Sequence, residues 1–201
     1  MNPDGRYRFR LNVNGPHQAA NAATAVKALE VLTRVKPGIR IQAHAVEKGI
    51  AETSIPGRIE VVDARPPVIL DAGHNPESTA ALADYLGEQK KKNLTLVFGV
   101  LNDKNYRKMI GLLMPYINDV ILTAPQSERA LSPATMKRIF QAGGKNVRVC
   151  PRPAEALDTA RQLKKPILVT GSFYLVGVLR NLLKPGNNQI EANPRPGGNY
   201  G

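Results

Sequence analysis

Residues 67–76 read PVILDAGHNP, and this stretch decides how the chain folds. Its apolar part, residues 68–70, predicts a short strand that is buried on both faces of a sheet. An acid, Asp71, and an imidazole, His74, follow it, and a helical pattern begins just after them. In an open α/β sheet, ligands bind at the carboxyl ends of the strands. The stretch therefore predicts an α/β fold and puts two candidate site residues at the edge of its sheet.

Short β-branched runs alternate with helical patterns from Arg58 onward. The expected strands are 59–62, 68–70, 94–98, 119–122, 147–150 and 167–169, and the expected helices are 78–90, 106–114, 133–142, 154–164 and 173–183. This alternation predicts an α/β fold with a Rossmann-like, mostly parallel six-stranded sheet and helices on both faces. The gap between the first two strands is too short for a parallel crossover, so we expect that pair to be antiparallel.

The first part of the chain follows a different pattern. Apolar and polar side chains alternate over residues 7–13, which predicts a half-buried strand. An alanine-rich helix is expected from Gln18 to about Val35. A second helix is expected over residues 41–48, with Gly49 as its C-terminal cap.

Three regions are expected from these patterns. Residues 1–54 form the first, and the strand–helix alternation places the second at residues 55–184. The third, residues 185–201, is rich in glycine, proline and asparagine and has almost no apolar residue. Such a composition cannot bury a core, so we expect a disordered tail.

Composition is that of an ordinary globular protein, with 42% hydrophobic and 22% charged residues. Cys150 is the single cysteine, so no internal disulfide can form, and a cytoplasmic location is the expectation. No apolar run approaches the roughly 20 residues that a membrane helix needs, and the first residues lack the pattern of a signal peptide. We therefore expect no membrane partner.

The net charge of +12 has several explanations. It could reflect a solvated basic surface, or it could draw in an anionic small substrate. Nucleic acid is the third candidate. The aromatic content of 5% and the scattered basic residues argue against it, because no binding motif is recognisable.

Further polar clusters lie at the ends of the expected elements, and each also has a purely structural explanation. Asn21, in the first turn of its helix, could simply bond backbone groups. Arg58 follows Pro-Gly and could clamp a phosphate with its planar fork, or lie on the surface as an ordinary arginine. Ser172 could cap the last helix, whose backbone N–H groups could also hold an anion. Capping by Asn75 or Ser78 would not explain Asp71 or His74.

Several common signatures are absent from the sequence. It contains no G-x-x-x-x-G-K-[ST] phosphate loop, no G-x-G-x-x-G, no zinc-ligand spacing and no G-x-S-x-G. We therefore expect no metal site, and any nucleotide would find its main phosphate cradle elsewhere.

Taken together and in order, the clusters resemble one family. They read NAATA at residues 21–25, PGR at 56–58, VILDAGHNP at 68–76, GVLNDK at 99–104 and TGSFY at 170–174. The set is similar to the C-terminal part of folylpolyglutamate synthase/dihydrofolate synthase, in the Mur ligase family. The resemblance covers roughly residues 7–183. It implies the Mur ligase C-terminal domain fold, preceded by a strand and helices of the central domain.

The resemblance also implies an activity. Such enzymes use ATP and magnesium to add L-glutamate to dihydropteroate or tetrahydrofolate through an acyl phosphate. Asn21, Arg58 and Asp71 match positions that contact ATP, whereas His74 and Ser172 match positions near the incoming glutamate or the γ-phosphate. Asp71 and His74 are thus the expected catalytic residues. These roles come from the resemblance alone.

The family's phosphate loop and magnesium ligands would precede this chain. The resemblance therefore implies that residues 1–54 are a remnant of the central ATPase domain, that the rest of that domain is the main partner, and that the chain alone is inactive. The alternative is a freestanding, non-catalytic α/β module that binds a nucleotide or a partner. Nucleic-acid binding would leave the polar clusters unexplained.

Overall fold

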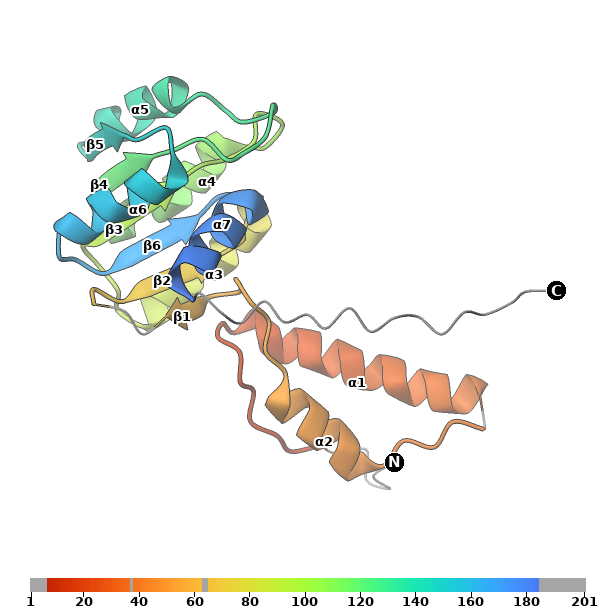
Figure 1. Cartoon of the computed structure of the whole chain (residues 1–201). Coiled ribbons are helices and arrows are strands. Elements are labelled where there is room, and N and C mark those ends of the chain that lie inside the picture. The colour runs from red at the N-terminus through yellow and green to blue at the C-terminus, as the bar shows by residue number, and fades with distance from the viewer. Residues whose placement is uncertain (1–6, 37, 63–64, 185–201) are drawn as a thin grey trace.

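The structure is a computed structural model, and it describes residues 7–36, 38–62 and 65–184. One six-stranded sheet, in the order β1-β2-β6-β3-β4-β5, lies at the core of its α/β part (Figure 1). The strands are β1 (Glu60–Val62), β2 (Val68–Asp71), β3 (Leu94–Phe98), β4 (Ile117–Leu122), β5 (Asn146–Val149) and β6 (Ile167–Thr170). The helices are α1 (His17–Val35), α2 (Ala43–Glu52), α3 (Pro76–Glu88), α4 (Tyr106–Leu113), the 3₁₀ turn η1 (Met114–Tyr116), α5 (Pro133–Ala142), α6 (Pro153–Gln162) and α7 (Phe173–Leu183).

The sheet topology confirms the predicted α/β class. The β1–β2 hairpin is antiparallel, and every other neighbouring pair is parallel. The last strand, β6, lies between β2 and β3, so Asp71 of β2 is opposite Thr170 of β6. The loops that follow β2 and β6 are therefore neighbours, and Gly171 N donates a hydrogen bond to Gly73 O at 3.1 Å.

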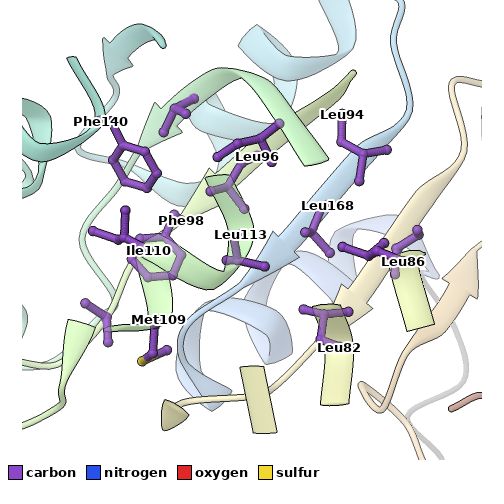
Figure 2. Close-up of a cluster of buried hydrophobic side chains, with 14 of the residues drawn as sticks. Leu82, Leu86, Leu94, Leu96, Phe98, Met109, Ile110, Leu113, Phe140 and Leu168 are labelled. Atoms are coloured by element: carbon purple, nitrogen blue, oxygen red, sulfur yellow. The ribbon is translucent and has the colours of Figure 1, made fainter. Parts of the chain in front are cut away.

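Helices cover both faces of the sheet, as expected for parallel strands that are apolar throughout. Helices α3, α4 and α5 pack on one face, where Figure 2 shows Leu82 and Leu86 of α3 and Met109, Ile110 and Leu113 of α4 against the strands. Helices α6 and α7 cover the opposite face through a second apolar cluster. Burial of both faces explains why β2, β3 and β6 have no exposed residue.

Local sequence signals set two helix starts beside the sheet edge. Asn75 caps α3: its Oδ1 accepts from Ser78 N at 2.8 Å, and Ser78 Oγ completes a capping box. Pro76 occupies the first helical position, which suits its missing N–H. Ser172 caps α7, and its Oγ accepts from Tyr174 N at 3.2 Å. The capping interpretations of Asn75 and Ser172 are confirmed.

Two predictions for the first part of the chain are wrong. Residues 7–13 form no strand, although their exposure alternates residue by residue. A strand needs a neighbour to take its N–H and C=O groups, and no strand of the described residues pairs with this segment. Gly49 is not a cap either, because α2 continues through it to Glu52.

Helices α1 and α2 lie beside the sheet domain rather than on it (Figure 1). Within α1 only Gln18 and Val26 are buried, and within α2 only Val46. The expected tail at 185–201 lies outside the described residues. Among the residues that are described, no helix is long and apolar enough to cross a membrane.

Candidate nucleotide pocket

A pocket of about 370 Å³ lies where the start of α1 meets the carboxyl end of β2 and the start of α3. Three predicted site residues, Asn21, Arg58 and Asp71, line it together although they are far apart in the sequence. The remaining lining residues are His17, Gln18, Ile55, Glu77, Ser78 and Ala81. The pocket thus presents both signs of charge, with amide and hydroxyl groups between them.

A smaller, mostly apolar pocket of about 150 Å³ adjoins the first one. The two share Gln18, Asn21 and Ile55. Its other lining residues are Leu11, Val13, Ala22, Ala25, Ile50 and Thr53. A polar pocket that continues into an apolar one suits a ligand with a charged end and an apolar end.

Asp71 ends β2 and is only 4% exposed. Its Oδ2 accepts from Ile59 N at 3.1 Å, and its Oδ1 accepts from Gly73 N at 2.9 Å. Burial raises the pKa of Asp71, and it outweighs both hydrogen bonds and the nearby charges of Arg58 and His17. The carboxylate therefore lines the pocket and also holds the backbone N–H groups of Ile59 and Gly73.

The loop that presents Arg58 is held in an unusual conformation. Gly57 and Ile59 both have positive φ, at +67° and +46°. A left-handed backbone is easy for glycine but costs a β-branched residue about 1–3 kcal/mol. Asp71 holds the strained Ile59 N, and Ala72 N donates to Gly57 O at 2.7 Å. The loop is thus fixed against β2, and Arg58 points from it into the pocket.

Glu60 supports the same loop from its other end. Its carboxylate accepts from Gly57 N, Arg180 Nε and Lys184 Nζ, each at 2.8 Å. Burial favours the neutral acid, but these hydrogen bonds and charges win and lower the pKa of Glu60 to about 2. The cluster ties α7 to the loop of Arg58.

We expect Glu60→Gln to lower the free energy of unfolding at pH 7 by about 2 kcal/mol, a value reduced for the partial exposure of the ion pairs. Because the folded-state pKa is depressed, this stability is present above pH 4.5 and is lost as the pH falls towards 2. Urea unfolding of both proteins between pH 7 and pH 2.5 measures it. Glu88→Gln, at an exposed site, is the control. A deficit that did not shrink at low pH would contradict the assignment.

His74 and Ser172 do not line this pocket. His74 is half-buried after β2, and its Nδ1 lies 3.2 Å from Ala72 O. Ser172 is 2% exposed, with its hydroxyl oxygen engaged in the cap of α7. His74 follows Gly73 and Ser172 follows Gly171, and the backbone hydrogen bond between these two glycines joins the two loops. Both residues thus lie beside the pocket and do not line it.

Asn21 differs from its expected local role. Helix α1 begins at His17, which puts Asn21 at the start of the second turn, and its Nδ2 donates to the side-chain oxygen of Gln18 at 3.0 Å. The amide is thus held by another side chain and not by backbone groups. The sequence interpretation also missed Gln18, His17 and Glu77 as pocket residues. His17 and Gln18 lie three or four residues before Asn21, at the expected start of the same helix, and this closeness in sequence was the available signal.

The donor set offers no obvious place for a divalent cation. Among the described residues, no group of three or more His, Cys, Asp or Glu side chains is placed to bind one ion. Both carboxylate oxygens of Asp71 accept hydrogen bonds from backbone N–H groups. The described residues do not fit a magnesium site, so the magnesium ligands stay a prediction that comes from the resemblance.

Comparison with known proteins identifies the family of this chain. Residues 57–173 match the family described as Mur ligase, glutamate ligase domain. A probable bifunctional folylpolyglutamate synthase/dihydropteroate synthase of Haloferax volcanii is 34% identical over 85% of this chain and 20% of its own length. The dihydrofolate synthase/folylpolyglutamate synthase of Mycobacterium tuberculosis is 29% identical over 86% of this chain and 39% of its own.

Solved structures of the same family resemble this chain. The folylpolyglutamate synthase of Mycobacterium tuberculosis, complexed with ADP and AMPPCP, superposes with a TM-score of 0.81 at 30% identity over 90% of this chain and 43% of that one. The chain therefore spans less than half the length of the relatives that it matches. On this evidence the chain belongs to the Mur ligase family, in its group of folylpolyglutamate and dihydrofolate synthases.

Proposed function

We propose that the chain is part of an ATP-dependent ligase that adds L-glutamate to dihydropteroate or tetrahydrofolate. Residues 55–184 are its C-terminal domain, and residues 1–54 belong to its central ATPase domain. One observation carries the proposal: Asn21, Arg58 and Asp71, which match the family's ATP-contacting positions, come from separate segments and line one pocket.

The two adjoining pockets suit ATP. The apolar pocket offers aliphatic walls to a base, with Asn21 and Gln18 at the junction as hydrogen-bonding groups. Arg58 supplies a planar fork of N–H donors that matches phosphate oxygens. Asp71 accepts hydrogen bonds and lies where Arg58 and His17 offset its charge. A related enzyme solved with ADP supports a nucleotide as the ligand.

The proposed reaction has two steps. The carboxylate of the folate substrate attacks the γ-phosphate of ATP, which gives an acyl phosphate and ADP. The amine of glutamate then attacks the acyl carbon, and phosphate leaves. In this reaction the protein mainly positions the groups and offsets charge. Arg58 does so for the phosphates, whereas His74 and Ser172 act near the incoming glutamate or the γ-phosphate. Magnesium, when bound, offsets further phosphate charge.

The surface of α1 supports assigning residues 1–54 to another domain. Val31, Leu32 and Val35 of this helix are exposed, with 71% of Val35 accessible. Aliphatic side chains along one helix end are commonly covered by further protein. The match to under half of each relative fits the same proposal.

The isolated chain is expected to release no ADP from ATP when dihydropteroate or folate, glutamate and magnesium are present. The physical reason is that the pocket offers Arg58 but no phosphate loop. A coupled assay of ADP release measures this, and the whole ligase under the same conditions is the positive control. ADP release by the chain that disappears in an Asp71→Ala variant would overturn the assignment of an inactive part.

Titration with labelled ATP separates the proposal from the freestanding module. An incomplete site should bind ATP weakly or not at all. Micromolar affinity of the chain alone, without ADP release, would favour a non-catalytic nucleotide-binding module instead.

A further inference from the structure

Phe173, the first residue of α7, contacts two of the predicted site residues at once. Its ring centroid lies 4.7 Å from that of His74, with the planes tilted by 46°. The guanidinium carbon of Arg58 lies 5.1 Å from the same centroid, over the ring. We propose that Phe173 is a positioning residue whose ring holds both Arg58 and His74. The consequence for catalysis rests on the proposed function.

Core packing does not account for this phenylalanine. The residues of α7 that pack on the sheet are Leu175, Val176 and Leu179, whereas Phe173 is 51% exposed. Its ring therefore adds little to the buried interface of the helix. Its contacts instead join two groups that belong to different loops.

The ring stabilises Arg58 without consuming its hydrogen-bond donors. Among the described residues, Arg58 forms no ion pair with a carboxylate at contact distance. A carboxylate would occupy the edge of the guanidinium, where the five N–H donors lie. An aromatic ring takes the face instead and leaves the edge for an anion. This arrangement suits an arginine that must be held in place and still bind phosphate.

The backbone around Phe173 is fixed, so the ring has a defined position. Gly171 adopts φ +108°, and a side chain there would meet Gly99 O at 2.7 Å. Gly171 N bonds Gly73 O, which joins the loop of Phe173 to the loop of His74. The Arg58 loop is bonded to the same region through Gly57 O and Ala72 N. The contacts of the Phe173 ring add to these backbone links between the three loops.

The test compares Phe173→Leu with Phe173→Tyr, and Tyr174→Leu is the matched control. Tyr174 is the next residue and is 52% exposed, yet no aromatic or cation–π contact of it with Arg58 or His74 is found in the described residues. Leucine keeps an apolar side chain at the helix start but has no ring, whereas tyrosine keeps the ring.

The first readout is the NMR signals of the His74 ring protons and the Arg58 Nε–H in this chain. A ring within about 5 Å shifts them by its ring current. Phe173→Leu should abolish both shifts, and Phe173→Tyr and Tyr174→Leu should preserve them. If Phe173→Leu left both signals in place, the proposal would be overturned, whatever the chain binds.

The second readout is the steady-state kinetics of the whole ligase. Phe173→Leu should raise the KM for ATP and for glutamate about two- to fivefold, the scale of one exposed cation–π contact, and Phe173→Tyr should restore both. Unchanged KM values in Phe173→Leu, with Arg58→Ala impaired, would overturn the positioning role and spare the proposed function. If Arg58→Ala itself had no effect, the proposed function would fail, and the NMR signals would still decide whether Phe173 holds Arg58 and His74.

Discussion

Replacing Arg58 by alanine is expected to reduce kcat/KM of the whole ligase about 30- to 900-fold. This corresponds to the roughly 2–4 kcal/mol that one preorganised charged donor supplies to a transition state. Arg58 projects into the pocket from a loop whose strained Ile59 is held by Asp71 and whose Gly57 is held by Glu60. Since these supports fix the backbone on either side of Arg58, the proposed phosphate contact would cost little ordering of the loop.

Two further variants make the Arg58 result specific. Arg58→Lys keeps the charge but loses the planar fork, so its activity should lie between that of the parent and that of the alanine variant. Arg138→Ala removes the same charge from α5, in a groove formed with α4, and should leave kcat/KM unchanged within a factor of two or so, as for most surface changes. Near-normal turnover of Arg58→Ala would refute the phosphate role.

Much of the sheet domain could be predicted from the sequence because its signals are local. The apolar runs of β2, β3 and β6 are buried on both faces, so their composition alone marks them as strands. Helix α3 begins at Pro76 with a capping asparagine before it, and such signals act within one turn. The hairpin of β1 and β2 followed from the length of the gap between them.

Other features depend on contacts that sequence spacing does not encode. Alternation at residues 7–13 predicted a strand, but strand formation depends on a partner, and none lies beside this segment in the described part of the chain. The pocket unites Asn21 with Arg58 and Asp71 only because α1 reaches the edge of the sheet. The resemblance to a known family grouped these residues, whereas periodicity could not.

The carboxylates of Asp71 and Glu60 show why residue type alone does not fix a role. Both bond backbone N–H groups of the Arg58 loop. Glu60 also meets two cations, which lower its pKa, whereas burial dominates at Asp71 and raises its pKa. Glu60 therefore stabilises the folded state most at neutral pH. The charged form of Asp71 lowers the stability of the folded state at neutral pH. Buried acids with a raised pKa are common at functional sites.

Replacing Asp71 by alanine is expected to lower the free energy of unfolding of this chain by about 2–4 kcal/mol. The change leaves Ile59 N and Gly73 N buried without an acceptor, at about 1–3 kcal/mol each. Urea unfolding measures the loss. Asp84→Ala, at an exposed position on α3, is the control and should change the free energy by less than about 0.5 kcal/mol. A loss equal to that control would mean that the carboxylate does not hold the loop.

Asp71→Asn separates the charge from the hydrogen bonds. The amide keeps one acceptor oxygen and never ionises. Because the folded-state pKa of Asp71 is raised above 3.8, the parent chain should lose stability relative to Asp71→Asn as the pH rises from 3.8 through that raised value. A difference in the free energy of unfolding between the two proteins that stayed constant with pH would contradict the raised pKa. If the parent instead loses stability relative to Asp71→Asn as expected, and the ligase carrying Asp71→Asn is inactive, the charge of Asp71 serves the proposed reaction and not the stability of the fold.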